Sequence, residues 1–232
     1  MRGFSYVCAS LHPYEMTSKQ TDIAAIRAEY DMGQLSEEGI AADPVVQFRK
    51  WLDEAIERQV MEPNAMTLST ASVSGLPSSR IVLLKHLDDS GFGFFTNYES
   101  QKGEELHENP QAALLFFWPE LQRQVRITGR VEKMPAHLSD AYFRSRPLGS
   151  QLGAIASPQS REIAGRWVLD AQLAELAERY KGNAPVPRPA HWGGYLLVPD
   201  RLEFWQGGSN RLHDRLVYSR QDNDWKIARL AP

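Results

Sequence analysis

The chain has 232 residues, of which 42% are apolar and 10% aromatic, so it can bury a sizeable core. Its 26 basic and 29 acidic residues give a formal net charge of −3, which argues against a global positive field that would recruit nucleic acid or an anionic membrane. Cys8 is the only cysteine, which excludes an internal disulfide and a cysteine-built zinc site and suits a reducing cytoplasm.

The first residues resemble neither an export signal nor a membrane anchor. Residues 1–21 mix Ser, His, Pro and Glu, and no run in the chain approaches the ~18 apolar residues of a membrane span. We therefore expect a cytoplasmic protein with a disordered tail over residues 1–21. A single domain should follow over residues 22–232.

Two helices are predicted before the first strand. A short one should cover Asp22–Tyr30, followed by a polar loop to Ala42. Asp43 and Pro44 are good residues for the N-cap and first position of the next helix. Its apolar residues recur at helical spacing, at Val45, Phe48, Trp51, Leu52, Ile56 and Val60. This pattern predicts an amphipathic helix lying on a sheet.

The middle of the chain alternates in the manner of antiparallel strands. Five are predicted, with a short helix over Lys102–Glu108 between the third and fourth: Met66–Thr70, Arg80–Leu87, Phe92–Asn97, Ala112–Trp118 and Gln122–Lys133. Short links between this many strands suggest a small closed barrel.

The last third returns from helix to strand. Helices are predicted over Pro135–Ser145 and Ser160–Tyr180, the second with one apolar face formed by Ile163, Trp167, Leu173, Leu176 and Tyr180. After a proline-rich linker, strands are predicted over Gly194–Val198, Arg201–Gln206, Leu212–Arg220 and Trp225–Leu230. These strands are too few for a barrel of their own, so we expect them to complete the first sheet.

Chemistry-bearing residues gather around a glycine pair near the C-terminus. Gly207 and Gly208 permit close backbone approach to a ligand, Arg211 and Arg215 offer planar donor forks for an anion, and His213 offers an imidazole that can exchange a proton. Arg211 and His213 are two apart, so on a strand they would share a face. A Gly-Gly hairpin with solvent-facing charges is the alternative reading.

Arg80 and Lys85 bracket four apolar residues on a predicted strand. Being five positions apart, they should point to opposite faces unless a bulge intervenes, and could then serve different anions. Strand-end charges reaching solvent remain the alternative.

Two further segments could bind phosphate. Ser100-Gln101-Lys102 stands at a predicted helix start, where free N–H groups attract anions. Tyr142, Arg146 and Ser150 recur at a spacing of four, so the first two share a helical face and the third continues it past Pro147. Ordinary helix-end residues would look the same in both cases.

Metal and dinucleotide sites are not indicated. The histidines lack Glu or Cys at ligand spacing, and no Gly-x-Gly-x-x-Gly follows a strand.

Taken together, these segments resemble the pyridoxine (pyridoxamine) 5′-phosphate oxidase family from about Ile26 to Pro232. The likeness rests on Arg27-Ala28-Glu29-Tyr30, Arg80–Lys85, Phe95-Thr96-Asn97, Arg123-Gln124-Val125, Tyr142–Pro147, Ser150–Gly153, Gln159-Ser160, Trp192-Gly193-Gly194, Phe204–Arg215 and Trp225–Pro232. Each segment is modestly specific, but their number and order are highly so.

The resemblance implies a mainly β fold with flanking helices, an FMN-binding split β-barrel, and a homodimer with FMN in clefts between the subunits. The implied activity is oxidation of pyridoxine or pyridoxamine 5′-phosphate by O2. The products would be pyridoxal 5′-phosphate, H2O2 and, from the amine, NH3, in the last step of vitamin B6 cofactor synthesis and salvage.

The resemblance also implies residue roles. Arg80 and Lys102 would hold the FMN phosphate, and the rest of the flavin site would comprise Ile81, Val82, Leu83, Leu84, Lys85, Phe95, Thr96, Gln101, Gln124, Gln159, Ser160, Trp205 and Arg215. The substrate phosphate would contact Lys85, Tyr142, Arg146 and Ser150. Arg211 and His213 would be catalytic and, with Leu212, lie over the substrate ring, while Arg27 and Tyr30 would belong to a closing segment.

Gln101 departs from the family pattern, in which Arg commonly precedes the lysine. The change keeps hydrogen bonding and removes a charge, which predicts weaker FMN binding unless another cation substitutes. A non-catalytic FMN or pyridoxal phosphate binder and a flavin reductase are the competing readings. Neither has a use for the substrate-side residues Lys85, Arg146 and His213.

Overall fold

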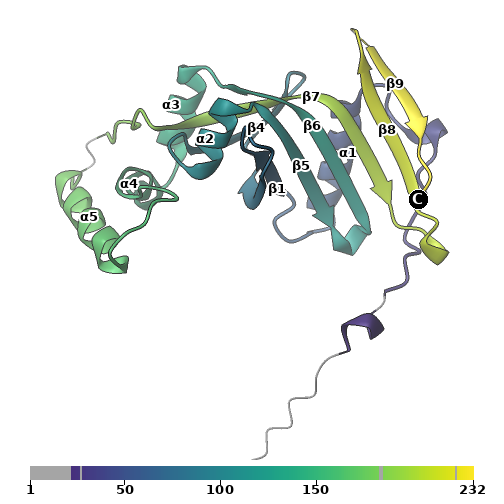
Figure 1. The fold of residues 1–232 in the computed structure, drawn as a ribbon, viewed down its shortest axis with the longest axis horizontal. Coiled ribbons are helices and arrows are strands. Elements are labelled where there is room, and N and C mark those ends of the chain that lie inside the picture. Colours follow the sequence, from purple (N-terminus) through teal and green to yellow (C-terminus); the bar gives the residue numbers. More distant parts are fainter. Residues whose placement is uncertain (1–21, 27, 183–184, 223) are drawn as a thin grey trace, which may run out of the picture.

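The computed structural model describes residues 22–26, 28–182, 185–222 and 224–232. The predicted disordered tail over residues 1–21 and the predicted substrate residue Arg27 lie outside these ranges. The predicted helix over Asp22–Tyr30 is wrong, because only a single 3₁₀ turn, η1 (Ile23–Ala25), forms there, and it lies away from the body of the protein (Figure 1). No residue of this turn is buried, so nothing stabilises a longer helix.

The described residues form one nine-stranded sheet with antiparallel pairing throughout. Its strands are β1 (Ala65–Ala71), β2 (Pro77–Leu83), β3 (His86–Asp88), β4 (Gly91–Asn97), β5 (Gln111–Trp118), β6 (Arg123–Lys133), β7 (Trp192–Gln206), β8 (Asp214–Gln221) and β9 (Asp224–Arg229). The main path runs β2-β1-β5-β6-β7-β4-β3, and β8 and β9 extend from β7. The prediction that the C-terminal strands complete the first sheet is confirmed.

A closed barrel was predicted, but the nine strands are not joined into a closed ring of hydrogen-bonded pairs. The predicted strand Arg80–Leu87 is divided into β2 and β3, which lie at opposite ends of the sheet path. At the division, the Leu84 N–H donates to the Asn64 carbonyl at 2.8 Å, whereas the Lys85 N–H donates to the Gly93 carbonyl at 2.9 Å. The chain thus passes from one edge of the sheet to the other within two residues, which is consistent with a split barrel.

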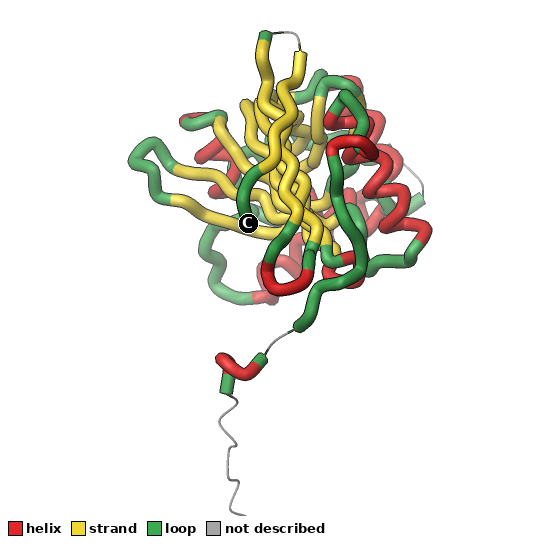
Figure 2. Tube along the Cα trace, turned by 90° about the vertical axis from the view of Figure 1, so that its right-hand side faces the viewer, coloured by secondary structure: helices red, strands yellow, loops and turns green. Residues whose placement is uncertain are grey.

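β7 is one long strand where two were predicted. It tolerates Pro199, which lacks an N–H, because the register with β6 shifts at Thr128/Gly129 where Pro199 pairs. The strand therefore runs the length of the molecule, from the α2–α3 end to the β8–β9 end (Figure 1). The β8–β9 hairpin projects from the body (Figure 2).

Helix α1 (Pro44–Glu57) covers the core as predicted. Asp43 caps it by accepting from the N–H groups of Val45 and Val46. Phe48 is fully buried, and its ring meets the rings of Phe92 and Phe116 at centroid distances of 4.9 and 4.7 Å. The predicted core position Ile56 is exposed, since the helix turns it away from the sheet.

The remaining helices are α2 (Gln101–Glu108), α3 (Ala136–Ser145), α4 (Leu148–Ala156) and α5 (Arg166–Arg179), with 3₁₀ turns η2 (Glu37–Gly39), η3 (Pro119–Leu121) and η4 (Ser209–Arg211). Helix α4 was not predicted. It forms with α5 a group at one end of the molecule (Figure 1), around a second small core that includes Phe143, Leu152 and Leu176.

The predicted apolar face of the last helix is wrong. Helix α5 begins at Arg166, so Ile163 precedes it, and Trp167 is 67% exposed. Leu176 is the buried residue of α5. The helix packs mainly on α4, which is too narrow to cover a whole apolar face.

Candidate functional site

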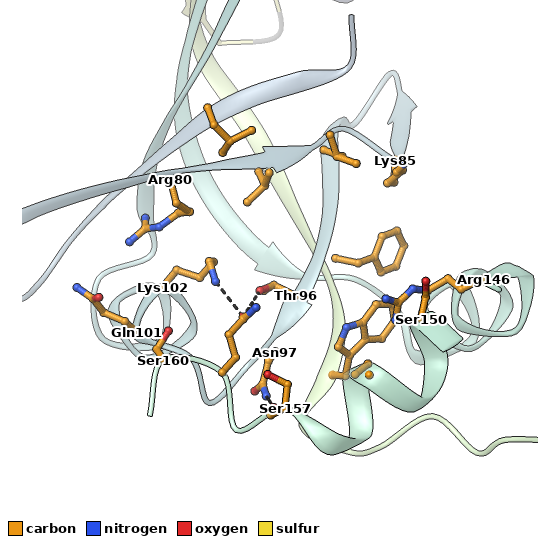
Figure 3. Close-up of a pocket in the computed structure, with 18 of the residues that line it drawn as sticks. Arg80, Lys85, Thr96, Asn97, Gln101, Lys102, Arg146, Ser150, Ser157 and Ser160 are labelled. Atoms are coloured by element: carbon orange, nitrogen blue, oxygen red, sulfur yellow. Dashed lines mark hydrogen bonds between the residues drawn. The ribbon is translucent and has the colours of Figure 1, made fainter. Parts of the chain in front are cut away.

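A cavity of about 860 Å³ brings together residues from five parts of the chain: β2 and Lys85, β4, the start of α2, the α3–α4 region with the loop after it, and the first residue of β7. Fourteen of the residues predicted from sequence line it: Arg80, Ile81, Val82, Leu83, Lys85, Phe95, Thr96, Gln101, Lys102, Tyr142, Arg146, Ser150, Gln159 and Ser160. The cations fall into two groups on opposite sides (Figure 3). Arg80 and Lys102 form one, and Lys85 and Arg146 the other.

Lys102 is held at the first group by the start of α2. Ser100 caps this helix by accepting from the Gly103 N–H, and the first two helical residues, Gln101 and Lys102, line the cavity. The Lys102 Nζ donates to the Gln159 Oε1 at 3.0 Å and to the Ser100 Oγ at 3.3 Å. Burial and the neighbouring Arg80 charge lower the pKa of Lys102 to about 8. The site thus holds a cation whose charge changes just above neutral pH.

Arg80 is fixed by a buried polar network around Glu105. Its guanidinium donates to the hydroxyls of Thr70 and Ser78 at 2.5 and 2.6 Å, and both hydroxyls donate in turn to the Glu105 carboxylate. Arg80 also pairs with Glu105 directly at 3.4 Å. Both Nη groups of Arg80 donate within this network, to Thr70, Ser78 and Glu105, so the guanidinium is fixed in place before an anion binds.

Glu105 is ionised in this network. Burial raises the pKa of Glu105, but hydrogen bonds from Ser78, Thr70 and Gln101 and the charge of Arg80 outweigh burial, so the pKa lies below its usual value. Gln101 donates to the Glu105 Oε1 at 2.9 Å. The negative charge of Glu105 therefore offsets part of the positive charge of this group.

Arg146 belongs to the second cation group and has an unsatisfied donor. Its Nη1 atom is buried without a hydrogen-bond partner among the described residues. The guanidinium carbon lies 4.8 Å from the Trp192 ring centroid, and burial lowers the pKa of Arg146. A buried guanidinium donor that faces a cavity suits an anionic ligand, since leaving it unpaired costs free energy.

The predicted grouping of Tyr142, Arg146 and Ser150 occurs, but not on one continuous helix. Tyr142 lies in α3, Arg146 has extended backbone angles after the end of α3, and Ser150 lies in α4 after Pro147. All three line the cavity because the chain turns between the two helices.

Several cavity residues were not predicted to form the site, among them Asn97, Ser157 and Trp192. The Trp192 ring is nearly parallel to those of Phe95 and Tyr142, at centroid distances of 5.6 and 6.2 Å. Asn97 and Trp192 stand in the segments that carry the family resemblance, which is the signal that could have found them.

The other predicted residues lie elsewhere. Leu84 is buried in the core, and Tyr30, Gln124, Trp205, Arg211, Leu212, His213 and Arg215 are not among the residues that line the cavity. Trp192 and Trp205 stand near opposite ends of the 15-residue β7, so at about 3.3 Å per residue they lie roughly 40 Å apart along it. Within one subunit, the residues predicted to form one site are therefore divided into two groups that lie near opposite ends of β7.

Around the second end, three rings meet. Trp205 and His213 have centroids 4.6 Å apart, and the Tyr30 ring stands edge-on to both at 5.8 and 5.7 Å. The Gly208 N–H donates to the His213 Nδ1 at 3.1 Å. Since a backbone N–H can only donate, the neutral imidazole carries its proton on Nε2, where it can donate to a ligand.

Arg211 and Arg215 differ in environment. Arg215 donates to the buried Glu203 through Nε and Nη2 at 2.9 and 2.8 Å and to the Ala231 carbonyl at 2.8 Å. Arg211 is exposed at the end of η4. The prediction that Arg211 and His213 share a strand face is wrong, because Arg211 has a φ of 61° and β8 begins only at Asp214.

Among the described residues, none of the helices has the length and apolarity needed to cross a membrane. The same residues contain no cluster of three or more His, Cys, Asp or Glu side chains able to hold a metal ion.

Comparison with known proteins assigns most of the chain. Residues 52–180 match the family model described as pyridoxamine 5′-phosphate oxidase, and residues 192–232 match the pyridoxine 5′-phosphate oxidase C-terminal dimerisation region. A pyridoxine/pyridoxamine 5′-phosphate oxidase from Cupriavidus pinatubonensis is 56% identical over 91% of this chain and 100% of its own. Another from Ralstonia nicotianae is 59% identical with the same coverage.

Solved structures agree on the fold. PhzG from Burkholderia lata, in complex with tetrahydrophenazine-1-carboxylic acid, superposes with a TM-score of 0.83 at 35% identity and covers 88% of this chain and 100% of its own. A pyridoxamine 5′-phosphate oxidase-related, FMN-binding protein from Nostoc punctiforme has a TM-score of 0.64 at 16% identity over 80% of this chain and 97% of its own, which supports the fold alone. The chain belongs to the pyridoxamine 5′-phosphate oxidase family.

Proposed function

We propose that the protein is an FMN-dependent oxidase that converts pyridoxine 5′-phosphate or pyridoxamine 5′-phosphate to pyridoxal 5′-phosphate with O2. H2O2 is the second product, and the amine substrate also releases NH3. The observation that carries the proposal is a single cavity with two separate cation groups, Arg80 with Lys102 and Lys85 with Arg146. A phosphorylated cofactor and a phosphorylated substrate require two such groups.

The cavity residues fit FMN. Arg80 and Lys102 would hold its phosphate at the start of α2, with Gln101 beside them. Gln159, Ser160, Thr96 and the residues of β2 would contact the rest of the flavin. When bound, FMN supplies the acceptor for the hydride and passes the electrons to O2.

The second cation group would bind the substrate phosphate. Arg146 offers its unpaired Nη1, Lys85 and Ser150 lie on the same side of the cavity (Figure 3), and Tyr142 also lines the cavity. Holding the phosphate fixes the distant C4′ atom, from which the hydride leaves, and so converts binding energy into orientation. The aromatic rings of Phe95 and Trp192 limit the space that water can occupy.

We further propose that the protein is a homodimer in which FMN lies between subunits. Arg211, Leu212 and His213 would reach the substrate ring from the partner subunit, with Trp205, Gln124 and Arg215 on the flavin side. The dimerisation-region match over residues 192–232 and the separation of the two groups along β7 support this arrangement. In it, the His213 Nε2–H would donate to a substrate oxygen, and Arg211 would stabilise electron density on the ring.

The described chain is best read as one domain over residues 22–232, because its last strands pair within the same sheet as its first. The residue composition, with one cysteine, supports a cytoplasmic location.

An anaerobic titration tests the activity. Addition of pyridoxine 5′-phosphate to the FMN-loaded protein should bleach the flavin absorbance, and air should restore it with release of pyridoxal 5′-phosphate. Flavin that binds but is not bleached would indicate a non-catalytic binder. Bleaching by a nicotinamide cofactor, and not by the phosphorylated substrates, would indicate a flavin reductase.

A further inference from the structure

Gln122 holds a segment that lies far from it in the sequence. Its Oε1 atom accepts from the N–H groups of Asp31 and Met32 at 2.9 and 3.1 Å, and its Nε2 donates to the Glu29 carbonyl at 3.2 Å. One side chain therefore satisfies three backbone groups within four successive residues. These residues form neither helix nor strand, so no ladder supplies those bonds.

The backbone of Gln122 is itself fixed. Its φ of 54° lies in the left-handed region, which costs free energy for a residue other than glycine. Its N–H donates to the Pro119 carbonyl at 3.1 Å, and its carbonyl accepts from the Gly207 N–H at 2.8 Å. The left-handed turn directs the Gln122 amide from the end of η3 toward residues 29–32.

Tyr30 lies inside this held segment, against the end of β7. A Cβ atom on Gly207 would stand 2.7 Å from the Tyr30 Cδ1 and 3.0 Å from the Gln122 Cβ. The lack of a side chain at Gly207 thus makes room for Tyr30, whose ring meets those of Trp205 and His213. Two independent features therefore position the Tyr30 ring: the hydrogen bonds of the Gln122 amide and the absence of a side chain at Gly207.

We propose that Gln122 is a positioning residue that docks residues 29–32 and so sets Tyr30 against His213 and Trp205. The part of this proposal that concerns substrate rests on the proposed function. Gln122 takes no part in bond making. It orders residues 29–32 before substrate arrives, so the loss of conformational entropy on ordering them does not weaken substrate binding.

The backbone conformation at position 122 must be separated from the reach of its side chain. Asn adopts left-handed φ more readily than most residues, but its amide is one methylene shorter. Gln122→Asn therefore keeps the turn and withdraws the three hydrogen bonds. Gln122→Glu keeps the reach and the two acceptor bonds to Asp31 and Met32, and it loses the donor to Glu29.

Hydrogen exchange of the Asp31 and Met32 amides in the FMN-loaded protein is the direct readout. In Gln122→Asn we expect exchange to accelerate on the order of tenfold, the effect of losing about one net hydrogen bond per amide. Gln122→Glu should retain the protection. Gly207→Ala should weaken it by displacing Tyr30, whereas Gln111→Asn, at the exposed start of β5, should leave it unchanged.

Kinetics then test the positioning role. Gln122→Asn should raise KM for pyridoxine 5′-phosphate by about fivefold to tenfold, with kcat and flavin content little changed, and Gln122→Glu should recover most of the loss. Unchanged exchange at Asp31 and Met32 would overturn the docking. Faster exchange with an unchanged KM would overturn the positioning role. If the wild-type protein proved not to oxidise the substrate, the exchange data alone would still decide the docking.

Discussion

The Lys102 Nζ lies 3.0 Å from the Gln159 Oε1, and the same oxygen accepts from the Thr96 hydroxyl at 3.2 Å. Lys102 lies in the first turn of α2, Thr96 is the penultimate residue of β4, and Gln159 follows α4, so one amide joins three parts of the cavity wall. Arg161 adds a second tie by donating to the Glu99 carbonyl at 3.0 Å. The loop after α4 is thereby held against the start of α2, where the phosphate of FMN is proposed to bind.

FMN affinity should fall as the pH rises above about 8. The Lys102 pKa of about 8 means that the free protein loses this charge there, while a bound phosphate favours the protonated form. The phosphate itself is a dianion throughout, since its second pKa is about 6. We expect the Kd to be nearly flat from pH 7 to 8 and then to rise toward about tenfold per pH unit, as uptake of one proton requires.

Titration of apo-protein with FMN, followed by quenching of flavin fluorescence, measures this dependence. Lys102→Met should bind more weakly at pH 7 and show a flat profile between pH 7 and 10. A wild-type slope that persists in Lys102→Met would assign the titration to another group.

Gln101→Arg should tighten FMN binding. The Gln101 amide already contacts Glu105 at 2.9 Å, so an arginine there would offset the carboxylate charge and leave Arg80 freer for phosphate. A charged hydrogen bond exceeds a neutral one by about 1 kcal/mol, which predicts a decrease in Kd of roughly fivefold. Equilibrium titration at two salt concentrations checks it, because the gain should shrink with salt, whereas Gln101→Leu should show no gain.

Arg146→Met should weaken substrate binding without lowering the stability of the protein. The variant removes a charge-assisted bond to the substrate phosphate, so KM should rise about tenfold to a hundredfold. It also removes a buried, unpaired Nη1 donor, so the melting temperature should be unchanged or higher. Steady-state kinetics and calorimetry on the same preparation measure both, and a marked loss of flavin or a lower melting temperature would point to a structural role for Arg146.

Hybrid dimers test the proposed intersubunit site. Arg146→Met alters the cavity, and His213→Ala alters the β7–β8 connection, so in a mixed dimer one site would carry both changes and the other neither. At substrate concentrations well below the KM of Arg146→Met, where each variant alone has little activity, random mixing should then restore about a quarter of wild-type activity. If each subunit built its own site, mixing would restore nothing, and co-expression with two affinity tags distinguishes the two results.

The sequence predicted best those elements whose signals are local. Helix α1 formed as expected because its cap and apolar spacing lie within a few residues of each other. The break between β2 and β3 was not predictable, since it depends on where the N–H groups of Leu84 and Lys85 find carbonyls on distant strands. The left-handed φ of Arg211 likewise follows from the β7–β8 connection and not from its own preference.

For the site, the family resemblance named most of the cavity residues correctly as neighbours, but not their division along β7. A set of residue types carries no distances, and the length of β7 depends on the register shift with β6 that accommodates Pro199. Gln122 was expected merely to begin a strand. Its contacts with residues 29–32 are long-range side-chain bonds, which no local pattern reports.

The crossing at Leu84 and Lys85 has a consequence for spacing between the two cation groups. Arg80 and Lys85 would face opposite sides of a straight strand, yet both line the cavity because the chain changes sheet edge between them. The five-residue separation of Arg80 and Lys85 along the backbone therefore limits the distance between the two cation groups. An insertion at position 84 would lengthen this spacing and so alter which pairs of anions fit, even where every side chain is retained.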